Sequence, residues 1–401
     1  MSRSNRTLEE LGFVGRGRSR NRPRDAAHLY GGPYPFIQTA EVKHSTLYVT
    51  EYSQTYSEEG LAQSKLWPSG TLCITIAANI ADTAILSFDA CFPDSVIGFV
   101  PYEGMSDARY IKYLFDFSLQ RRFKVFSQGA TQDNLSEAKL LSLKLTVPDI
   151  DEQERVADIL STYDALIENN RRRIELLEQA ARLLYQEWFI RFRFPGHEHI
   201  KIVDGVPEGW ERTTIRDSFR LLGGYPFKSS TYREHGKYGI VTIKNVHDGE
   251  FRPECTTYVD EPPNNLEKHC YLSTGDILLS LTGNIGRTCI VFGDNYLLNQ
   301  RVAVIVPNEG VPITYAYWFF KDTNTQHKLE NLSYGVAQQN LSTNTLGEQE
   351  YLRPAFRILL LFDFYLRDTF NLICNLNIFK QKLKQARDLL LPRLMSGEIA
   401  I

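Results

Sequence analysis

Apolar residues recur at alternating intervals of four and three positions through residues 151–192. These intervals average the 3.5-residue repeat of a coiled-coil seam, so the pattern predicts one long helix. Asp151, Gln153 and Glu154 lie at its first turn, where free N–H groups favour acceptors and negative charge. A helix of about 40 residues spans roughly 60 Å and needs a partner for its seam. The seam positions are Val156, Leu160, Tyr163, Ile167, Asn170, Ile174, Leu177, Ala181, Leu184 and Trp188.

The second half of the chain repeats the first at a nearly constant offset, from 238 − 34 = 204 to 335 − 129 = 206 residues. The resembling segments are 34–42 and 238–246, 70–81 and 275–286, and 129–136 and 335–342. An offset of 206 places a second apolar series near the end of the chain, where it can pair with the first seam. Lys380 and Arg387 in this series can lay their stems along the seam and keep their charges in water. Pro392 is expected to end or kink the helix. The series is Phe362, Leu366, Thr369, Ile373, Leu376, Lys380, Leu383, Arg387, Leu390 and Leu394.

Each copy in front of its helix combines short apolar or β-branched runs with one amphipathic helix. The predicted strands of the second copy are 239–246, 276–282, 288–292 and 301–307, and the predicted helices of the two copies are 107–117 and 313–321. We predict an α+β protein: two tandem α/β domains with two long antiparallel helices that form a coiled coil, related by a pseudo-two-fold repeat. Asn170, at a seam position where the copy has Leu376, is interpreted as setting the register of the seam. The predicted segments are the first domain (1–148), the first long helix with a linker (149–206), the second domain (207–353) and the second long helix with the C-terminal tail (354–401).

Composition allows buried cores and shows neither a membrane span nor a secretory signal. Hydrophobic residues make up 43% of the 401 residues, and the most apolar run, 358–366, is short and contains Asp363. The six cysteines form no C-x-x-C pair, so we expect reduced thiols and no zinc site. A cytoplasmic protein is expected.

The formal net charge of −3 conceals a local cluster of arginines. Arg16, Arg18, Arg20, Arg22 and Arg24 stand at every second position with no acidic residue among them. Phosphate contacts respond to such local charge density. The run could be a disordered basic tail. However, the chain soon turns into an apolar strand, which favours an ordered loop that contacts DNA.

The sequence lacks the motifs of common nucleotide-dependent and DNA-modifying enzymes. It contains no G-x-x-x-x-G-K-[ST] loop, no strand-linked G-x-G-x-x-G and no Asn-Pro-Pro-Phe stretch. The G-x-x-G at 283–286 is interpreted as a tight turn, and its relative at 78–81 has lost both glycines. Asp94 and Glu137 have the residue types of a metal-dependent nuclease, so a self-contained nuclease is the alternative. We predict no catalytic or metal site.

Amides and cations in the loops are suited to DNA recognition. Gln132 and Asn134, with their counterparts Gln338, Gln339 and Asn340, lie in the loop repeated before each long helix. Asparagine and glutamine can bind adenine bidentately, although such amides also serve as turn and capping residues. The other DNA-contact candidates are Lys43, Lys228, Lys244, Asn245 and Arg287.

Several motifs together resemble the specificity subunit of Type I restriction-modification enzymes, over essentially the whole chain. They are Val147-Pro-Asp-Ile-Asp-Glu-Gln153, Pro207-Glu-Gly-Trp210, the paired Gly-x-x-Gln-x-Asn-Leu-Ser loops and Leu394-Met-Ser-Gly-Glu-Ile399. The resemblance implies two target recognition domains, each reading half of a split double-stranded DNA site. It also implies a coiled coil that sets the spacer between the half-sites and binds two methyltransferase subunits.

The resemblance further implies that this chain binds no cofactor and catalyses nothing. S-adenosylmethionine would be bound by the methyltransferase subunits, and two restriction subunits would bring ATP- and Mg-dependent translocation and cleavage. The second helix departs from the family in its apolar start, 354–362, so we expect its first turn to pack differently against a methyltransferase subunit. The first domain has the arginine cluster and lacks a Gly-Trp opening, so each domain is expected to reach DNA differently. A coiled-coil assembly scaffold without a DNA role is the third interpretation.

Overall fold

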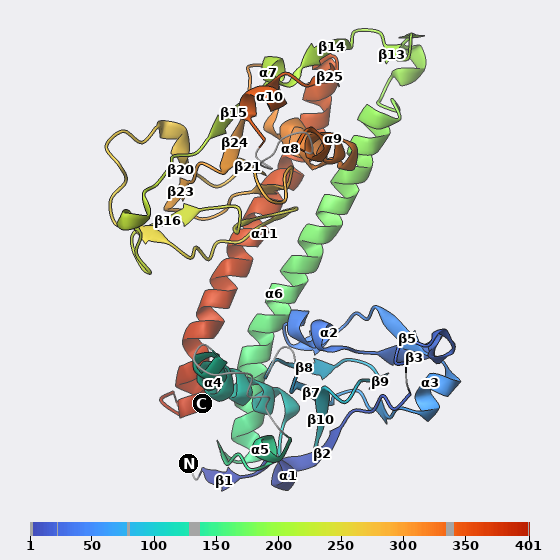
Figure 1. Cartoon of the computed structure of the whole chain (residues 1–401), viewed down its shortest axis with the longest axis vertical. Helices are drawn as coiled ribbons and strands as arrows, with labels where there is room; N and C mark the ends of the chain where they lie inside the picture. The colour runs from blue at the N-terminus through green and yellow to red at the C-terminus, as the bar shows by residue number, and fades with distance from the viewer. Residues whose placement is uncertain (1–2, 22, 78–80, 128–136, 334–340, 400) are drawn as a thin grey trace. The chain divides into compact units, whose positions relative to one another are not determined.

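The computed structural model describes residues 3–21, 23–77, 81–127, 137–333, 341–399 and 401. The chain forms two compact units: unit 1 is Met1–Asn169 with Gln381–Ile401, and unit 2 is Asn170–Lys380. The long helices α6 (Ile150–Tyr185) and α11 (Phe356–Ser396) both contribute residues to both units (Figure 1). Each unit therefore consists of one α+β domain and a segment of each long helix.

Two sheets, of five and four strands, form most of the domain of unit 1 in the described residues. The larger has the order β2-β10-β7-β8-β4, and the smaller has the order β5-β3-β9-β6 with a parallel pair β3–β9. Strand β1 pairs with β11 just before α6. The strands are β1 (Ser4–Arg6), β2 (Gly12–Arg16), β3 (Tyr30–Phe36), β4 (Tyr48–Val49), β5 (Gln54–Tyr56), β6 (Leu66–Trp67), β7 (Leu72–Thr75), β8 (Thr83–Leu86), β9 (Ala90–Cys91), β10 (Val96–Pro101) and β11 (Leu145–Val147). The helices are α1 (Leu8–Leu11), α2 (Thr39–His44), α3 (Glu58–Ala62), α4 (Ala108–Ser127) and α5 (Glu137–Leu141), with a 3-10 turn at Ala27–Leu29.

The domain of unit 2 repeats this plan. Its sheets have the orders β15-β24-β21-β22 and β19-β16-β23-β20, and β14 pairs with β25 just before α11. The strands are β12 (Ile202–Val203), β13 (Val206–Pro207), β14 (Glu211–Thr214), β15 (Phe219–Gly223), β16 (Tyr238–Val241), β17 (Val246–His247), β18 (Glu250–Phe251), β19 (Tyr258–Val259), β20 (Tyr271–Leu272), β21 (Ile277–Ser280), β22 (Thr288–Ile290), β23 (Tyr296–Leu298), β24 (Val302–Pro307) and β25 (Glu350–Arg353). The helices are α7 (Ile215–Ser218), α8 (Ile313–Lys321), α9 (Thr323–Ser333) and α10 (Thr343–Gly347), and 3-10 turns lie at His197–His199, Ser229–Thr231 and Lys268–Cys270.

The repeat extends to strand register. In the parallel pair of the smaller sheet of unit 1, Phe36 lies opposite Cys91, and in the parallel pair of the smaller sheet of unit 2, Ile240 lies opposite Leu297. The differences, 240 − 36 = 204 and 297 − 91 = 206, match the sequence offsets. The two domains therefore share the register of this strand pair.

The turn between β21 and β22 contains two glycines, and the equivalent turn between β7 and β8 contains none. Gly286 N–H donates to Ser280 O at 3.1 Å, and Ala81 N–H donates to Thr75 O at 2.9 Å in the equivalent turn. Gly286 has φ +85°, and Ala81 is held in the same left-handed region at φ +65°. This conformation strains alanine but not glycine. The turn is therefore conserved between the copies although its residue type is not.

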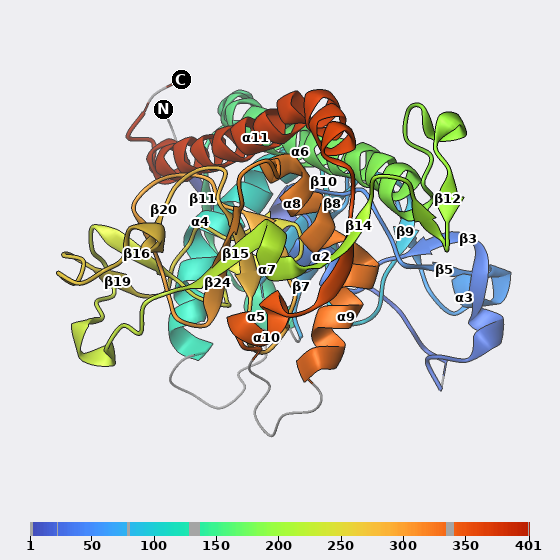
Figure 2. The same cartoon turned by 90° about the horizontal axis from the view of Figure 1, so that it is seen from above.

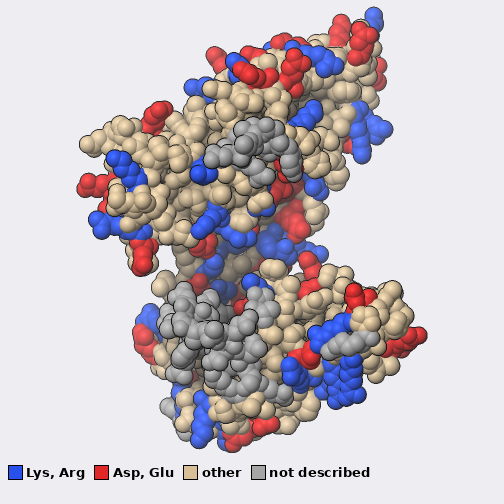
Figure 3. Space-filling model, in the orientation of Figure 1, with Lys and Arg blue, Asp and Glu red and all other residues tan. Residues whose placement is uncertain are grey.

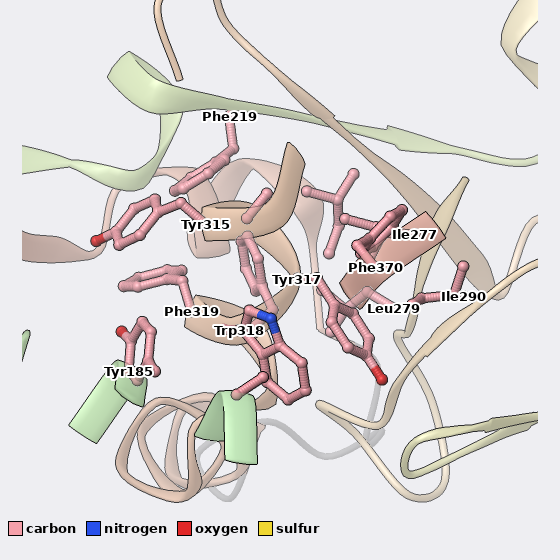
Figure 4. Packing of buried hydrophobic residues seen from close by; sticks show 14 of the residues in the cluster. Tyr185, Phe219, Ile277, Leu279, Ile290, Tyr315, Tyr317, Trp318, Phe319 and Phe370 are labelled. Atoms are coloured by element: carbon pink, nitrogen blue, oxygen red, sulfur yellow. The ribbon is translucent and has the colours of Figure 1, made fainter. Parts of the chain in front are cut away.

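Each unit has its own main core, and helices α4 and α8 occupy equivalent places in them. In unit 1, the core combines strand residues such as Ile74 and Phe99 with Tyr110 of α4 and Leu160 of α6. In unit 2, aromatic residues of α8 pack against both the larger sheet and the long helices (Figure 4). The domain of each unit is thereby joined to the long helices through apolar contacts. The labelled part of the unit 2 core comprises Tyr185, Phe219, Ile277, Leu279, Ile290, Tyr315, Tyr317, Trp318, Phe319 and Phe370.

Within each unit, the segments of α6 and α11 that belong to it lie side by side and run antiparallel (Figures 1 and 2). In unit 1, Asp164 of the first half of α6 meets Arg387 of the second half of α11. In unit 2, the Trp188 ring at the end of α6 lies 5.7 Å from the Phe362 ring near the start of α11. Every seam position named above is buried or partly buried. The helix of α6 ends in a π-helical turn, Gln186–Ile190, and α11 continues through Pro392 to Ser396, so the proline does not end it.

Two carboxylates on α6, the buried Asp164 and the partly buried Glu178, each accept a hydrogen bond from a tyrosine hydroxyl. In unit 1, Tyr113 donates to Asp164 at 2.6 Å, and Arg387 completes the charge pair. The pKa of Tyr113 is raised by burial and by the Asp164 charge, so its hydroxyl stays protonated and can donate. The charge of Arg387 is therefore paired inside the seam, which corrects the expectation that it lies in water.

Unit 2 contains the related cluster at Tyr317, which stands 317 − 113 = 204 positions after Tyr113. Its hydroxyl donates to Glu178 at 2.7 Å, and Lys321 pairs with the same carboxylate at 2.5 Å. Both tyrosines thus connect their domains to α6, one in its first half and one in its second half.

No helix within the described ranges is long and apolar enough to cross a membrane.

Candidate nucleic-acid interface

The arginine loop, residues 17–24, follows strand β2 directly, and its backbone is held by the rest of the domain. A side chain on Gly17 would place a Cβ 2.3 Å from Pro93 O, so only glycine allows this close approach. The loop is thus ordered in its described residues and is no disordered tail. Its N–H groups donate from Gly17 to Val96 O, from Arg18 to Phe92 O, and from Arg20 and Asn21 to Gln63 Oε1, at 2.6 to 3.0 Å.

The arginines of the cluster differ in how they are engaged. Arg24 pairs with Asp94 at 3.0 Å, and Arg16 donates through Nε to the Asp94 carbonyl oxygen. Arg18 and Arg20 are exposed and form no ion pair with a described residue, whereas Arg22 lies outside the described residues. The carboxylate of Asp94 is bound by Arg24, so Asp94 is the acidic member of a structural ion pair. Arg18 and Arg20 are the members best placed to meet phosphates.

Lys65 adds a positive charge that no sequence motif indicates. Its Nζ lies 3.7 Å from the ring centroid of Trp67 and 4.3 Å from that of Phe13. Burial lowers the pKa of Lys65, and the charge of Arg18 nearby lowers it further. An ammonium held over two rings loses less side-chain entropy on binding a phosphate than a freely moving one. Figure 3 shows Lys and Arg side chains gathered on this part of unit 1.

The counterpart of the arginine loop in unit 2 is segment 224–237, because it follows β15 as the arginine loop follows β2. Gly224 repeats the close approach of Gly17, since a Cβ there would lie 2.4 Å from a carbonyl oxygen of β23. Lys228 is exposed, whereas Arg233 pairs with Asp260 at 2.8 Å. The two loops therefore share a place in the fold but differ in charge.

Asn245 has a structural role. The residue is 2% exposed, and its Oδ1 accepts from Thr242 N–H at 2.9 Å. Its Nδ2 donates to two backbone carbonyl oxygens at 2.9 and 3.3 Å. The amide is not available to a base, which corrects the DNA-contact prediction for this residue. The same turn divides the predicted strand 239–246 between β16 and β17.

The remaining predicted residues are scattered over the domains. Lys43 on α2 and Lys244 beside the Asn245 turn are exposed, and Arg287 before β22 is partly buried. No group of three or more His, Cys, Asp or Glu side chains that could hold a metal occurs in the part of the chain that the structure describes. DNA contact by these three cations stays a prediction. The predicted amides Gln132, Asn134, Gln338, Gln339 and Asn340 lie outside the described residues.

Comparison with known proteins gives a consistent result. A family model described as the Type I restriction modification DNA specificity domain matches residues 4–179 and 207–350. The MjaIX specificity subunit of Methanocaldococcus jannaschii, from a Type I restriction enzyme, is 25% identical over 387 residues, covering 93% of this chain and 88% of that protein. The HindI specificity subunit of Haemophilus influenzae is 24% identical over 336 residues, covering 68% of this chain and 72% of that protein.

A solved structure supports the same fold. The S subunit of a Type I restriction-modification system from M. genitalium has a TM-score of 0.59 at 17% identity, and the match covers 98% of this chain and 96% of that one. The resemblance recognised from the motifs is confirmed by the family match, which covers both domains. This chain belongs to the family of Type I restriction-modification DNA specificity subunits, which are non-catalytic and serve in DNA sequence recognition and complex assembly.

Proposed function

We propose that this chain reads a split DNA target, with one half-site bound by each domain. The observation that carries the proposal is the repeated fold, in which strand order and register recur in both units. Each unit therefore has an equivalent loop after the first strand of its larger sheet, at 17–24 and 224–237. Because the two loops differ in charge, the two domains are expected to differ in their contacts with the DNA backbone.

Contacts with the DNA backbone and with the bases have different sources in this proposal. Arg18, Arg20 and Lys65 position the duplex through phosphates, since cations fix register without reading sequence. Amides at 132–134 and 338–340 are the predicted base readers, because asparagine and glutamine match the edge of adenine. The sequence of each half-site then depends on its own domain.

The outward faces of α6 and α11 bind two methyltransferase subunits, and restriction subunits join the complex through them. The support is that the seam uses only one side of each helix, which leaves exposed apolar residues such as Leu183 and Phe364 for partners. S-adenosylmethionine, ATP and Mg²⁺ are then bound by the partner chains. The number of helical residues between the domains sets the spacer between the half-sites.

The proposal is tested with the assembled complex and the genome of its host. Single-molecule sequencing should show methylated adenines in a split motif that disappears when this gene is deleted. Unchanged methylation would contradict the proposal. Inserting whole helical turns in both α6 and α11 should change the spacer while both half-sites stay the same, and a changed half-site with an unchanged spacer would refute the role of the helices.

The phosphate contacts have a separate test. The double variant Arg18→Ala/Arg20→Ala should reduce the slope of log affinity against log salt by about 1.8, from about 0.9 for each lost phosphate contact. Arg24→Ala is the matched control, because its charge is already paired with Asp94, and a smaller change is expected. Unchanged affinity and slope in the double variant would favour a scaffold without a DNA role.

A further inference from the structure

Helix α11 carries an exposed apolar face in unit 2. This α11 apolar face consists of Leu360, Phe364, Tyr365, Leu372 and Phe379. The last three of these residues stand seven positions apart, so they recur on one side of the helix. The exposed fractions of Phe364, Tyr365 and Phe379 are 76%, 55% and 58%.

The face is large enough to form much of an interface. An aromatic side chain can bury roughly 150–250 Å², so the three rings expose roughly 350–400 Å². A standard interface buries about 800 Å² on each partner, and its centre is rich in aromatic residues and poor in charges. The two leucines add to this apolar area. The α11 apolar face therefore has the composition of an interface centre.

The equivalent face of α6 is different. The offset of 206 relates the five residues of the α11 apolar face to Glu154, Asp158, Ile159, Leu166 and Arg173, as in 360 − 154 = 206. Glu154, Asp158 and Arg173 are exposed and charged, and Asp158 pairs with Arg109 at 2.7 Å, whereas Leu166 is exposed and Ile159 is partly buried. Burying such charges costs desolvation that apolar residues do not incur, so partner binding is opposed here and favoured at the α11 apolar face. The two copies of the fold thus offer two unequal surfaces.

We propose that the two methyltransferase subunits bind in a fixed order, the first at the α11 apolar face of unit 2 and the second at the equivalent face of α6, where three of the five residues are charged. This order rests on the proposed function, because it requires the long helices to bind these subunits. Identical subunits that meet unequal surfaces must bind with unequal affinity. The first association is therefore tight and the second weak, and complexes with one methyltransferase subunit accumulate when that subunit is limiting.

The experiment uses the full chain and its methyltransferase subunit at substoichiometric ratios. Mass photometry should show a one-to-one complex before the two-to-one complex. Hydrogen exchange of the one-to-one complex should show protection in residues 356–379 and none in residues 150–173. Protection of 150–173 first, or equal protection of both segments, would overturn the order. A dimer of this chain formed through the α11 apolar face would also overturn it.

Substitutions test the chemistry of the face. The double variant Leu360→Glu/Phe364→Asp places the residue types of unit 1 in unit 2 and should weaken the first association at least tenfold. The matched control is Leu389→Asp, an exposed leucine of the same helix in unit 1, which should leave the first association unchanged. Equal weakening by both variants would contradict the order. A wild-type chain that binds no methyltransferase subunit would instead refute the proposed function.

Discussion

Removal of Arg387 should destabilise unit 1 through the carboxylate that it leaves behind. The Asp164 side chain is 1% exposed, and in Arg387→Ala it would keep the hydrogen bond from Tyr113 at 2.6 Å but lose its charge partner. Loss of one partner of a buried ion pair costs about 3–5 kcal/mol. Because the Arg387 side chain is partly exposed, water can enter the vacated space, which favours the lower end of this range. A cost of about 3 kcal/mol corresponds to roughly a 150-fold change in the folding equilibrium.

The measurement is a urea titration in which hydrogen exchange of peptides from α4 and residues 150–169 reports the unfolding of unit 1. Peptides from β24 are the internal reference for unit 2. The matched control is Tyr113→Phe/Asp164→Leu/Arg387→Leu, which removes both charges together with the hydroxyl that donates to Asp164 and fills the site with apolar atoms. Replacement of a buried ion pair in this way is often neutral or stabilising, so we expect a cost below about 1 kcal/mol. If this triple variant were as unstable as Arg387→Ala, the uncompensated charge would not be the cause of the loss.

Ala81→Gly should stabilise unit 1 in urea unfolding by up to about 1 kcal/mol, because glycine tolerates the left-handed φ of this turn, and the reverse change Gly286→Ala should cost a similar amount. Hydrogen bonds from the Thr214 hydroxyl and N–H lower the pKa of Asp217 to about 2. Because this folded pKa lies below the ordinary value of 3.8, the stabilisation is fully present above that value and is lost as the pH falls through about 2; carboxyl NMR should show the pKa rising in Thr214→Val. Asn245→Ala should destabilise unit 2 by about 1–3 kcal/mol and leave the DNA affinity of the folded complex unchanged, whereas lost affinity at full stability would restore its role as a DNA contact.

The long helices and the repeat could be predicted because both are written in local sequence patterns. A seam is recognised from the regular spacing of its residues, and a repeat from a nearly constant offset between similar segments. Val156 and Phe362 can therefore be assigned to the seam without a structure. The bounds of α8 were predicted for the same reason, since its apolar residues follow a helical period. Features that one segment determines by itself are therefore accessible to this reasoning.

Pairings between distant residues could not be predicted in this way. Asp164 stands next to a seam position and shows no sign that it will be buried with Tyr113 and Arg387. Lys65 is fixed by rings from two different strands, and neither strand carries a signal for the other. The DNA-contact prediction for Asn245 is wrong because a turn amide and a base-reading amide have the same side chain, and only burial distinguishes them.

Unit 1 is built from two segments that are far apart in the sequence, Met1–Asn169 and Gln381–Ile401. This arrangement determines when unit 1 can fold during synthesis. Arg3 donates through Nη1 to Met395 O at 2.6 Å, and Leu394 and Met395 share the core with Val156. Unit 2 is one uninterrupted segment, Asn170–Lys380, so all of its residues leave the ribosome before Gln381. The domain of unit 1 is translated before that of unit 2 but completes its core later, because its surface at Val156 stays uncovered until Leu394 and Met395 have been translated.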